Sequence, residues 1–434
     1  MSPVALLIVV LVCIAVSVIV GNKLNINIGI LAMAFAYIIG TFIMGTSTKD
    51  LISYWPTSTM FTVLALLLFF GYVNETGASE KLAMKLLYKT RNHPAFMPFT
   101  ILIIAAILGL MGSNPFATAA ICCPIVFSIC SRTNKNPLLG FAMFTCGTNM
   151  FCYVPWASAY AVQKNKILEG PLAENADKYM VGVTFGYMVF FFLTAVLMYI
   201  WLKGPKYMTV EDEIKPVEPL DSKQKLAVVL VIIFVIVVVL PTALTTITGN
   251  PAIKAFSRKL DVGLVAAVFA AIAALCKLAD TKKVISKQVP WSTIVMICGV
   301  SMLITVASKG GAIDIVGDWI GSSLPKALIC PILFIIGGIL SMFVSTNNVA
   351  IPTLFTLVPS IFAASGISPV ILYMAIAVGC SSTGCFPFSG SGSFGLAMCS
   401  DEKLVKPLFN GQMKMAAFQL IIGIILSFVL SLVI

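Results

Sequence analysis

Long apolar runs, separated by short polar connections, make up most of the chain. The runs are apolar on every side and do not alternate with polar residues, which favours membrane helices over β-barrel strands. A helix needs about 20 residues to cross the hydrocarbon of a bilayer. No basic residue precedes the first run, so we expect a retained span and not a signal peptide. We predict spans near residues 3–20, 27–44, 57–74, 180–202, 225–245, 261–277, 290–307 and 411–433.

Two longer regions, 95–160 and 327–396, break this pattern. Gly, Ser, Asn and Pro interrupt the first at 112–115, and Ser, Thr and Asn interrupt the second at 345–348. We predict that each region contains a re-entrant hairpin with a polar tip, followed by a broken helix. Non-helical backbone at membrane depth occurs where it is buried in protein or lines a cavity. The tips are therefore candidate binding elements.

An amphipathic stretch precedes each predicted hairpin. The first covers residues 79–90 and carries a lysine at every fourth position, and the second covers 312–323. Helices with one apolar and one polar face lie in the plane of the membrane interface. We expect these two helices to be arms that carry the hairpins, although an ordinary loop helix would have the same pattern.

The two halves of the chain repeat one another in their Gly, Pro and Asn positions. Five crossings and one hairpin are predicted for each half, and an odd number of crossings inverts the second half relative to the first. The matched pairs are Gly29 and Gly263, Pro56 and Pro290, Gly77 and Gly311, and Asn114 and Asn348 at an offset of 234 residues, and Pro137 and Pro369, Gly147 and Gly379, and Pro155 and Pro387 at an offset of 232.

The predicted fold is an all-α polytopic membrane protein with two inverted repeats, about ten transmembrane helices and two re-entrant hairpins. The first repeat covers residues 1–205 and the second covers 225–434, with a polar cytoplasmic linker at 206–224. Uniformly apolar spans come first in each repeat and broken ones follow. We therefore expect scaffold segments at 1–92 and 225–326, and mobile segments with the hairpins and broken helices at 93–205 and 327–434.

Composition and charge agree with a membrane protein and predict its orientation. Hydrophobic residues make up 59% of the chain and charged residues 10%, whereas soluble domains carry about 25% charged residues. Basic residues concentrate in alternate connections, so the positive-inside rule predicts that both termini face outward from a plasma, or inner, membrane. The same bias explains the net charge of +11 without any nucleic-acid partner.

The chain lacks the motifs of an ATP-driven pump or a membrane enzyme. There is no Walker A sequence, and the single histidine, His93, has no metal-ligand spacing to any of the 12 cysteines. The cysteines lie mostly in apolar segments and are expected to pack there. We therefore predict that the protein is not an enzyme and binds no organic cofactor.

Four polar breaks supply the candidate chemistry, and all are rich in Ser, Thr and Asn. Their amides and hydroxyls can donate to a carboxylate, and their oxygens can bind a hard cation such as Na⁺. The predicted spans carry essentially no Asp, Glu, Arg or His, so Na⁺ coupling is favoured over proton coupling. The candidate substrate-binding residues are Ser113, Asn114, Asn347, Asn348, Thr118, Thr353, Asn149 and Ser382. The candidate Na⁺ ligands are Ser113, Asn114, Gly147, Asn149, Thr346, Asn348, Gly379 and Thr383.

Several of these segments resemble a known family. The run from Asn27 to Ala32, the loop before Pro56, the segment at 74–77 and the segment at 112–120 resemble MatC-type dicarboxylate carriers over about the first 130 residues. The overall layout is similar to the divalent anion–sodium symporter group of the ion transporter superfamily. That resemblance implies a homodimer with an elevator-type mechanism.

The resemblance also implies a role for the hairpin tips. In that group a Ser-Asn-Thr signature binds carboxylate and borders the sodium sites. The tips of this chain read Ser113-Asn114-Pro115 and Asn347-Asn348-Val349, so the threonine is missing and Thr118 or Thr353 would have to replace it.

The sequence thus predicts a secondary transporter in the lipid bilayer that imports small di- or monocarboxylates with Na⁺. A carboxylate exchanger and a proton-coupled anion carrier remain alternatives within transport. An anion channel is the alternative from another class.

Overall fold

The protein is described by a computed structural model that is helical throughout its described part, without a strand there. The described residues are 2–432 except 25, 91–92, 111–117, 120–121, 124–125, 128–129, 131–135, 205–216, 249–250, 258, 290, 343–344, 388 and 400.

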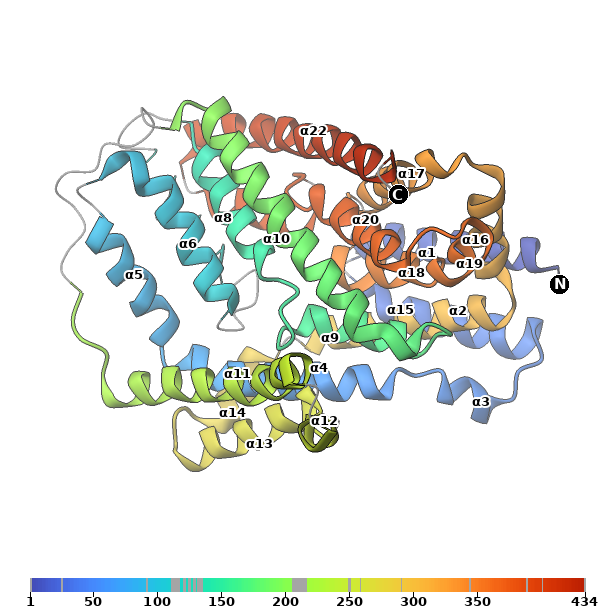
Figure 1. Cartoon of the computed structure of the whole chain (residues 1–434), viewed down its shortest axis with the longest axis horizontal. Helices are drawn as coiled ribbons and strands as arrows, with labels where there is room; N and C mark the ends of the chain where they lie inside the picture. Colours follow the sequence, from blue (N-terminus) through green and yellow to red (C-terminus); the bar gives the residue numbers. More distant parts are fainter. Residues whose placement is uncertain are drawn as a thin grey trace.

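Helices follow one another with short connections in both halves (Figure 1). Those of the first half are α1 Pro3–Leu24, α2 Ile28–Tyr37, the π-helical turn η1 Ile38–Ile43, α3 Thr48–Ser53, α4 Thr57–Glu75, α5 Ala78–Thr90, η2 Pro94–Phe96, α6 Met97–Leu110, α8 Leu138–Met150, α9 Ser158–Leu168, η3 Ala173–Asn175 and α10 Ala176–Trp201. Those of the second half are α11 Ser222–Thr248, α12 Pro251–Ser257, α13 Val262–Leu275, α14 Thr281–Lys283, η5 Val284–Gln288, α15 Trp291–Lys309, α16 Ala312–Ser323, α17 Lys326–Ser341, η6 Thr346–Ala350, α18 Ile351–Phe355, α19 Val358–Ser365, α20 Pro369–Ser382, α21 Gly390–Ala397 and α22 Glu402–Leu432.

Each of the eight predicted spans falls on a helix: α1, α2 with η1, α4, α10, α11, α13, α15 and α22. The expectation of an all-helical, multi-pass membrane protein is confirmed, and the number of crossings stays a prediction. Shorter apolar helices, including α6, α8, α17 and α20, accompany the long ones. Within the described part, the segments that are individually long and apolar enough to cross a membrane are Pro3–Gly21, Thr48–Glu75, Ala173–Trp201, Thr346–Ser365 and Glu402–Ser431.

The described residues test the second of the two predicted breaks but not the first. Helix α6 ends at Leu110, and the predicted first tip, with Ser113 and Asn114, lies outside the described residues. Helix α17 ends at Ser341, and the chain becomes helical again at Thr346. Asn347 and Asn348 therefore lie in the first turn of the returning helix and not in a loop.

The amphipathic stretches form helices α5 and α16 as predicted. A glycine in the left-handed region precedes each of them: Gly77 has a φ of 71° and Gly311 a φ of 73°. Glycine adopts this conformation without the steric cost of a Cβ atom. The turn at Gly311 bends the chain by 72° between α15 and α16.

Helices of the first half pack closely against helices of the second half at two glycines. A Cβ atom at Gly29 of α2 would lie 2.6 Å from the Cα of Met296 in α15. A Cβ atom at Gly263 of α13 would lie 2.9 Å from the Cα of Thr62 in α4. Both contacts bring backbones together at a spacing that only glycine allows. The two glycines, and likewise their two partners, are 234 residues apart.

Two further glycines allow close packing between the helices next to the breaks. Gly147 of α8 lies against α6, where a Cβ atom would be 2.3 Å from the carbonyl oxygen of Leu102. Gly379 of α20 lies against α17, where a Cβ atom would be 2.7 Å from the Cα of Phe334. Each broken helix is thus held against the helix that begins its interrupted region.

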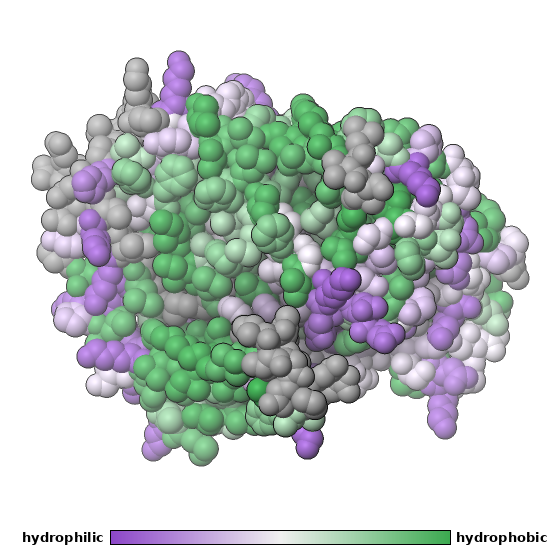
Figure 2. Space-filling view, viewed as in Figure 1, coloured by the Kyte–Doolittle hydropathy of each residue, from purple (hydrophilic) through white to green (hydrophobic). Residues whose placement is uncertain are grey.

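The surface agrees with a protein surrounded by lipid. Figure 2 shows a broad apolar area across this face, with hydrophilic residues gathered toward its two ends. Large apolar side chains such as Val181, Phe185 and Phe192 of α10 and Ile421 and Ile425 of α22 are more than half exposed. A soluble protein seldom exposes so much contiguous apolar surface, so these faces are suited to contact with lipid.

Candidate functional site

Polar side chains from both halves of the chain line one cavity. The cavity has an empty volume of about 570 Å³, including its open side. Its polar walls come from the ends of α8 and α20 and from the beginnings of η6 and α21. The lining residues are Ala119, Phe144, Thr145, Thr148, Asn149, Thr346, Asn347, Ser381, Gly384, Ser391 and Phe394.

The first polar wall is the last part of α8. Thr145, Thr148 and Asn149 each donate a side-chain hydrogen bond to a backbone carbonyl one turn earlier, at 2.9–3.0 Å. These bonds fix the side chains and use their donors. The hydroxyl lone pairs and the amide oxygen can still accept, or can contact a cation.

The second polar wall is the start of the returning helix at Thr346 and Asn347. The phenolic hydroxyl of Tyr153 donates a 2.7 Å hydrogen bond to Oδ1 of Asn347. The amide of Gln163 donates a 2.8 Å hydrogen bond to the backbone oxygen of the same residue. Tyr153 and Gln163 are both fully buried. Residues that follow α8 therefore hold both the side chain and the backbone of Asn347.

The third polar wall is the end of α20 with the start of α21. Tyr187 of α10 forms a short hydrogen bond with the Ser381 hydroxyl and donates to the backbone oxygen of Ala377 at 2.9 Å. Ser389 caps the start of α21 by accepting from the backbone N–H of Gly392 at 3.2 Å. This cap leads directly into Ser391, which lines the cavity.

Helix ends give the cavity its electrostatic character, since no side chain in its described lining is charged. Helices α8 and α20 end there, and a helix C-terminus carries partial negative charge. The segment Thr346–Ser365 and α21 begin there, and a helix N-terminus carries partial positive charge. The ends of α8 and α20 are therefore suited to a cation, and the beginnings of the segment Thr346–Ser365 and of α21 are suited to an anion.

Three of the predicted site residues, Asn149, Thr346 and Asn347, line this cavity together. Asn348 is half-buried and lies outside the lining. Thr118 is fully buried, and its hydroxyl has no hydrogen-bond partner among the described residues. Ser113 and Asn114 lie outside the described residues.

The remaining predicted residues lie at helix contacts near the cavity and do not line it. Thr383 donates a 2.6 Å hydrogen bond to the backbone oxygen of Gly338 in α17. Ser382 donates a 2.7 Å hydrogen bond to the backbone oxygen of Gly379. Gly147 belongs to the close contact between α8 and α6. Thr353 donates to the backbone of its own helix at 2.6 Å.

Sequence reasoning missed several residues of the cavity and its support. Ser391 lies in a Ser- and Gly-rich segment that could have been recognised as a further polar break. Tyr153, Tyr187 and Gln163 act through partners 184 to 194 residues away in the chain. No local pattern signals such contacts.

Solved structures of two transporters share this fold. The Alcanivorax borkumensis YdaH transporter has a TM-score of 0.58 and 14% sequence identity, covering 92% of this chain and 96% of its own. The Neisseria gonorrhoeae protein MtrF, from a class of antimetabolite efflux pumps, has a TM-score of 0.53 and 15% identity, covering 89% of this chain and 83% of its own.

Comparison of the sequence with known proteins and protein families gives one family match. No curated protein matches the chain. The family model for the N-terminus of the dicarboxylate carrier protein MatC matches residues 3–150, which include α1, α2, α4, α6 and α8. The resemblance to MatC-type dicarboxylate carriers that the sequence indicated is therefore confirmed over residues 3–150, and the chain shares its fold with the two solved structures.

Proposed function

We propose that the protein is a secondary active transporter that imports small di- or monocarboxylates together with Na⁺. One observation carries this proposal. The cavity lies where two helices end and two helical segments begin, and only neutral side chains line its described walls. Broken helices of this kind bind an anion at their N-termini and a cation at their C-termini in many secondary transporters.

The anion would bind near Thr346, Asn347 and Ser391. The N–H groups at a helix N-terminus point along the axis and attract negative charge. The amide of Asn347 and the hydroxyls beside it add donors. Asn348, Thr118, Thr353 and Ser382 do not line the cavity and remain proposed contributors, as do Ser113 and Asn114, which lie outside the described residues.

The cation would bind near the ends of α8 and α20. Asn149 and Thr148 present oxygens at one end, and Ser381 does so at the other. The proposed ligand set also includes backbone oxygens near Gly147 and Gly379 and the side chains of Thr346, Asn348 and Thr383. Hard cations prefer such oxygen ligands, and Na⁺ needs no carboxylate here.

Half-buried Glu75 and exposed Asp314 both have partners outside the cavity. Glu75 forms an ion pair with Lys283 and accepts a 2.7 Å hydrogen bond from Gln288. Asp314 accepts a 3.1 Å hydrogen bond from Ser360. Neither acid lines the cavity, which favours Na⁺ over H⁺ as the coupling ion.

The proposal extends to an inverted-repeat, elevator-type carrier. The repeat is supported by the equivalent glycine contacts, Gly29 on Met296 and Gly263 on Thr62, and by the left-handed glycines before α5 and α16. We infer that residues 1–92 and 225–326 form a scaffold in a homodimer, while 93–205 and 327–434 move. Both termini would face outward from the inner membrane.

Uptake into proteoliposomes tests the proposal. A panel of radiolabelled mono- and dicarboxylates is offered with an inward Na⁺ gradient, with a pH gradient alone, and with neither. We expect uptake of a carboxylate that requires Na⁺ and is stimulated by the same substrate on the opposite side. Uptake driven by pH without Na⁺ would make the protein a proton-coupled carrier. Exchange without net uptake would make it an exchanger, and flux without trans-stimulation would make it a channel.

A further inference from the structure

Helix α9 is an internal helix with a polar segment. It carries four consecutive polar residues at 163–166 and packs against α4, α10 and α18. Two polar atoms on it are buried without a hydrogen-bond partner, Oε1 of Gln163 and Nδ2 of Asn165. Buried polar atoms without partners are rare in native proteins and call for an explanation such as a ligand or water.

Lys166 is a cation on this helix whose side chain is largely buried. Its side chain is only 9% exposed, and its ammonium lies 2.9 Å from a carboxylate oxygen of Glu169, whose side chain is 43% exposed. An ionised group inside a membrane protein is costly and commonly belongs to a substrate or ion pathway. The two partners differ in exposure, because the Lys166 side chain is largely buried whereas the Glu169 side chain is accessible to solvent.

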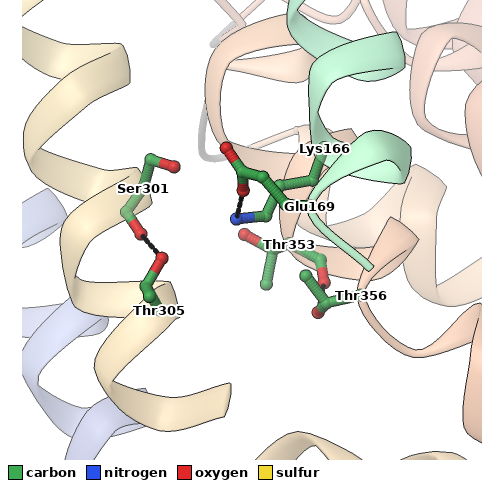
Figure 3. A network of polar contacts seen from close by, with 6 residues as sticks. All are labelled: Lys166, Glu169, Ser301, Thr305, Thr353 and Thr356. Atoms are coloured by element: carbon green, nitrogen blue, oxygen red, sulfur yellow. Dashed lines mark hydrogen bonds and ion pairs between the residues drawn. The ribbon is translucent and has the colours of Figure 1, made fainter. Parts of the chain in front are cut away.

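Polar side chains lie around Lys166. Figure 3 shows the Lys166 ammonium pointing toward Thr353, with Thr356 nearby and with Ser301 and Thr305 of α15 opposite. Lys166 lies one helical turn from Gln163, which holds the backbone of Asn347 at the cavity wall. Gln163 thus connects the helical turn that carries this positive charge to the cavity wall.

We propose that Lys166 is a docking residue for one carboxylate of the substrate, and that Glu169 is the counter-ion which the substrate displaces. This inference rests on the proposed carboxylate transport. Exchange of one carboxylate for another leaves the ammonium paired throughout, so the anion binds without creating an unpaired buried charge. The exposure of Glu169 allows it to move into water as the substrate arrives.

This mechanism and a purely structural ion pair predict different effects of two substitutions on the KM. If the pair only stabilises the fold, removing either partner destabilises the protein and leaves the KM unchanged. If Glu169 competes with the substrate, Lys166→Met weakens binding, whereas Glu169→Gln strengthens it. A mutation of the counter-ion that improves affinity has no structural explanation.

The test measures KM in proteoliposomes for the best dicarboxylate found in the wild-type screen and for its monoamide. We expect Lys166→Met to raise the KM for the dicarboxylate about 10-fold or more, as for loss of a hydrogen bond to a charged group. The preference for the dicarboxylate over the monoamide should shrink, and Glu169→Gln should lower the KM several-fold. The Na⁺ dependence should not change.

Lys164 provides the matched control on the same helix. Its side chain is 28% exposed and pairs at 2.7 Å with Asp177, which is 70% exposed. Lys164→Met should leave the KM within about twofold of wild type because a solvent-exposed pair contributes little. Lys166→Arg, which keeps the charge, should retain more affinity than Lys166→Met, and thermal unfolding in detergent checks that each variant folds.

Two outcomes would overturn the inference. One is an unchanged KM in Lys166→Met that transports the dicarboxylate. The other is a Glu169→Gln variant with unchanged or raised KM, which decides the matter even if Lys166→Met does not fold. A wild-type protein that transports no carboxylate would instead overturn the proposed function itself.

Discussion

The hydroxyl of Tyr153 donates a 2.7 Å hydrogen bond to Oδ1 of Asn347, across 194 residues of sequence. Tyr153 is fully buried, and its ring lies 4.4 Å from that of Tyr187, which contacts Ser381 on another wall of the cavity. The two tyrosines therefore connect two walls of one cavity from behind. The Asn347 oxygen thus accepts from Tyr153 and its amide nitrogen donates to Sγ of Cys152 at 3.5 Å, which leaves one N–H group to donate to an anion.

Tyr153→Phe removes this orienting bond without removing the ring. We expect the KM for the carboxylate to rise about 2- to 12-fold, because a typical hydrogen bond contributes about 0.5–1.5 kcal/mol. Uptake kinetics measure the change. Tyr199→Phe is the control, since the Tyr199 hydroxyl donates at 2.9 Å to Ala95 and does not contact the cavity. Equal effects of the two substitutions would count against a specific role for Tyr153.

Thr148→Val removes a hydroxyl oxygen at the end of α8 while keeping the shape of the side chain. If that oxygen contacts Na⁺, the Na⁺ concentration for half-maximal uptake should rise about 2- to 12-fold, by the same free energy of about 0.5–1.5 kcal/mol. Thr194→Val is the matched control, because Thr194 is fully buried and its hydroxyl has no partner. An unchanged Na⁺ requirement in Thr148→Val would remove this residue from the ligand set.

Gly147→Ala should destabilise the contact between α8 and α6. The new methyl group would lie 2.3 Å from the backbone oxygen of Leu102, so the helices must separate at a cost of about 1–3 kcal/mol. Thermal unfolding in detergent measures the loss. Gly109→Ala on α6 is the control, since its methyl group would come no closer than 3.6 Å to any neighbour. A Gly147→Ala variant as stable as this control would show that α6 and α8 can accommodate the methyl group without loss of stability.

Glu75→Gln and Asp314→Asn should both retain Na⁺-dependent uptake. Each acid has partners away from the cavity, so neither is expected to carry a transported proton. Uptake under a Na⁺ gradient, repeated at several external pH values, is the measurement. Loss of coupling in either variant, with the protein still folded, would identify that acid as part of the ion pathway.

Cross-linking tests the proposed movement of 93–205 and 327–434 against the scaffold. Cysteines replace Ser301 on α15 and Thr353 on α18 in a background without other accessible cysteines, and reagents of increasing length join them. Short reagents should stop uptake and longer ones should restore it. Asn27 and Ser292 are the control pair, since Asn27 donates at 2.8 Å to Ser292 within the scaffold. Full uptake with every Ser301–Thr353 linkage would argue against an elevator.

The apolar runs predicted the helices well because a membrane imposes the same requirement on every span. Approximately 20 apolar residues are needed, and eight such runs became helices. Local composition was sufficient for this feature. Gly77 and Gly311 were predicted only as a matched pair of the repeat, and their left-handed conformation before α5 and α16 is a finding of the structure.

The cavity was predicted only in part because its assembly depends on tertiary contacts. The polar breaks supplied Asn149, Thr346 and Asn347, but the direction in which each side chain points is decided by helix packing. Gly379 and Thr383 share one break with Ser381, yet only Ser381 lines the cavity. The polar run of α9 gave no signal of a site, because nothing local distinguishes an exposed lysine from one that is largely buried beside Glu169.

The glycine contacts between the halves also govern the order in which the protein can assemble. Gly29 of α2 and Thr62 of α4 meet their close partners only on α15 and α13. A ribosome makes those partners long after α2 and α4 have entered the membrane. Until then, lipid or an insertion factor must cover these two surfaces. The first half is therefore a folding intermediate that completes its packing only when the second half is present. A chain whose synthesis stalls would expose two unpaired helix faces, which could pair wrongly or lead to degradation.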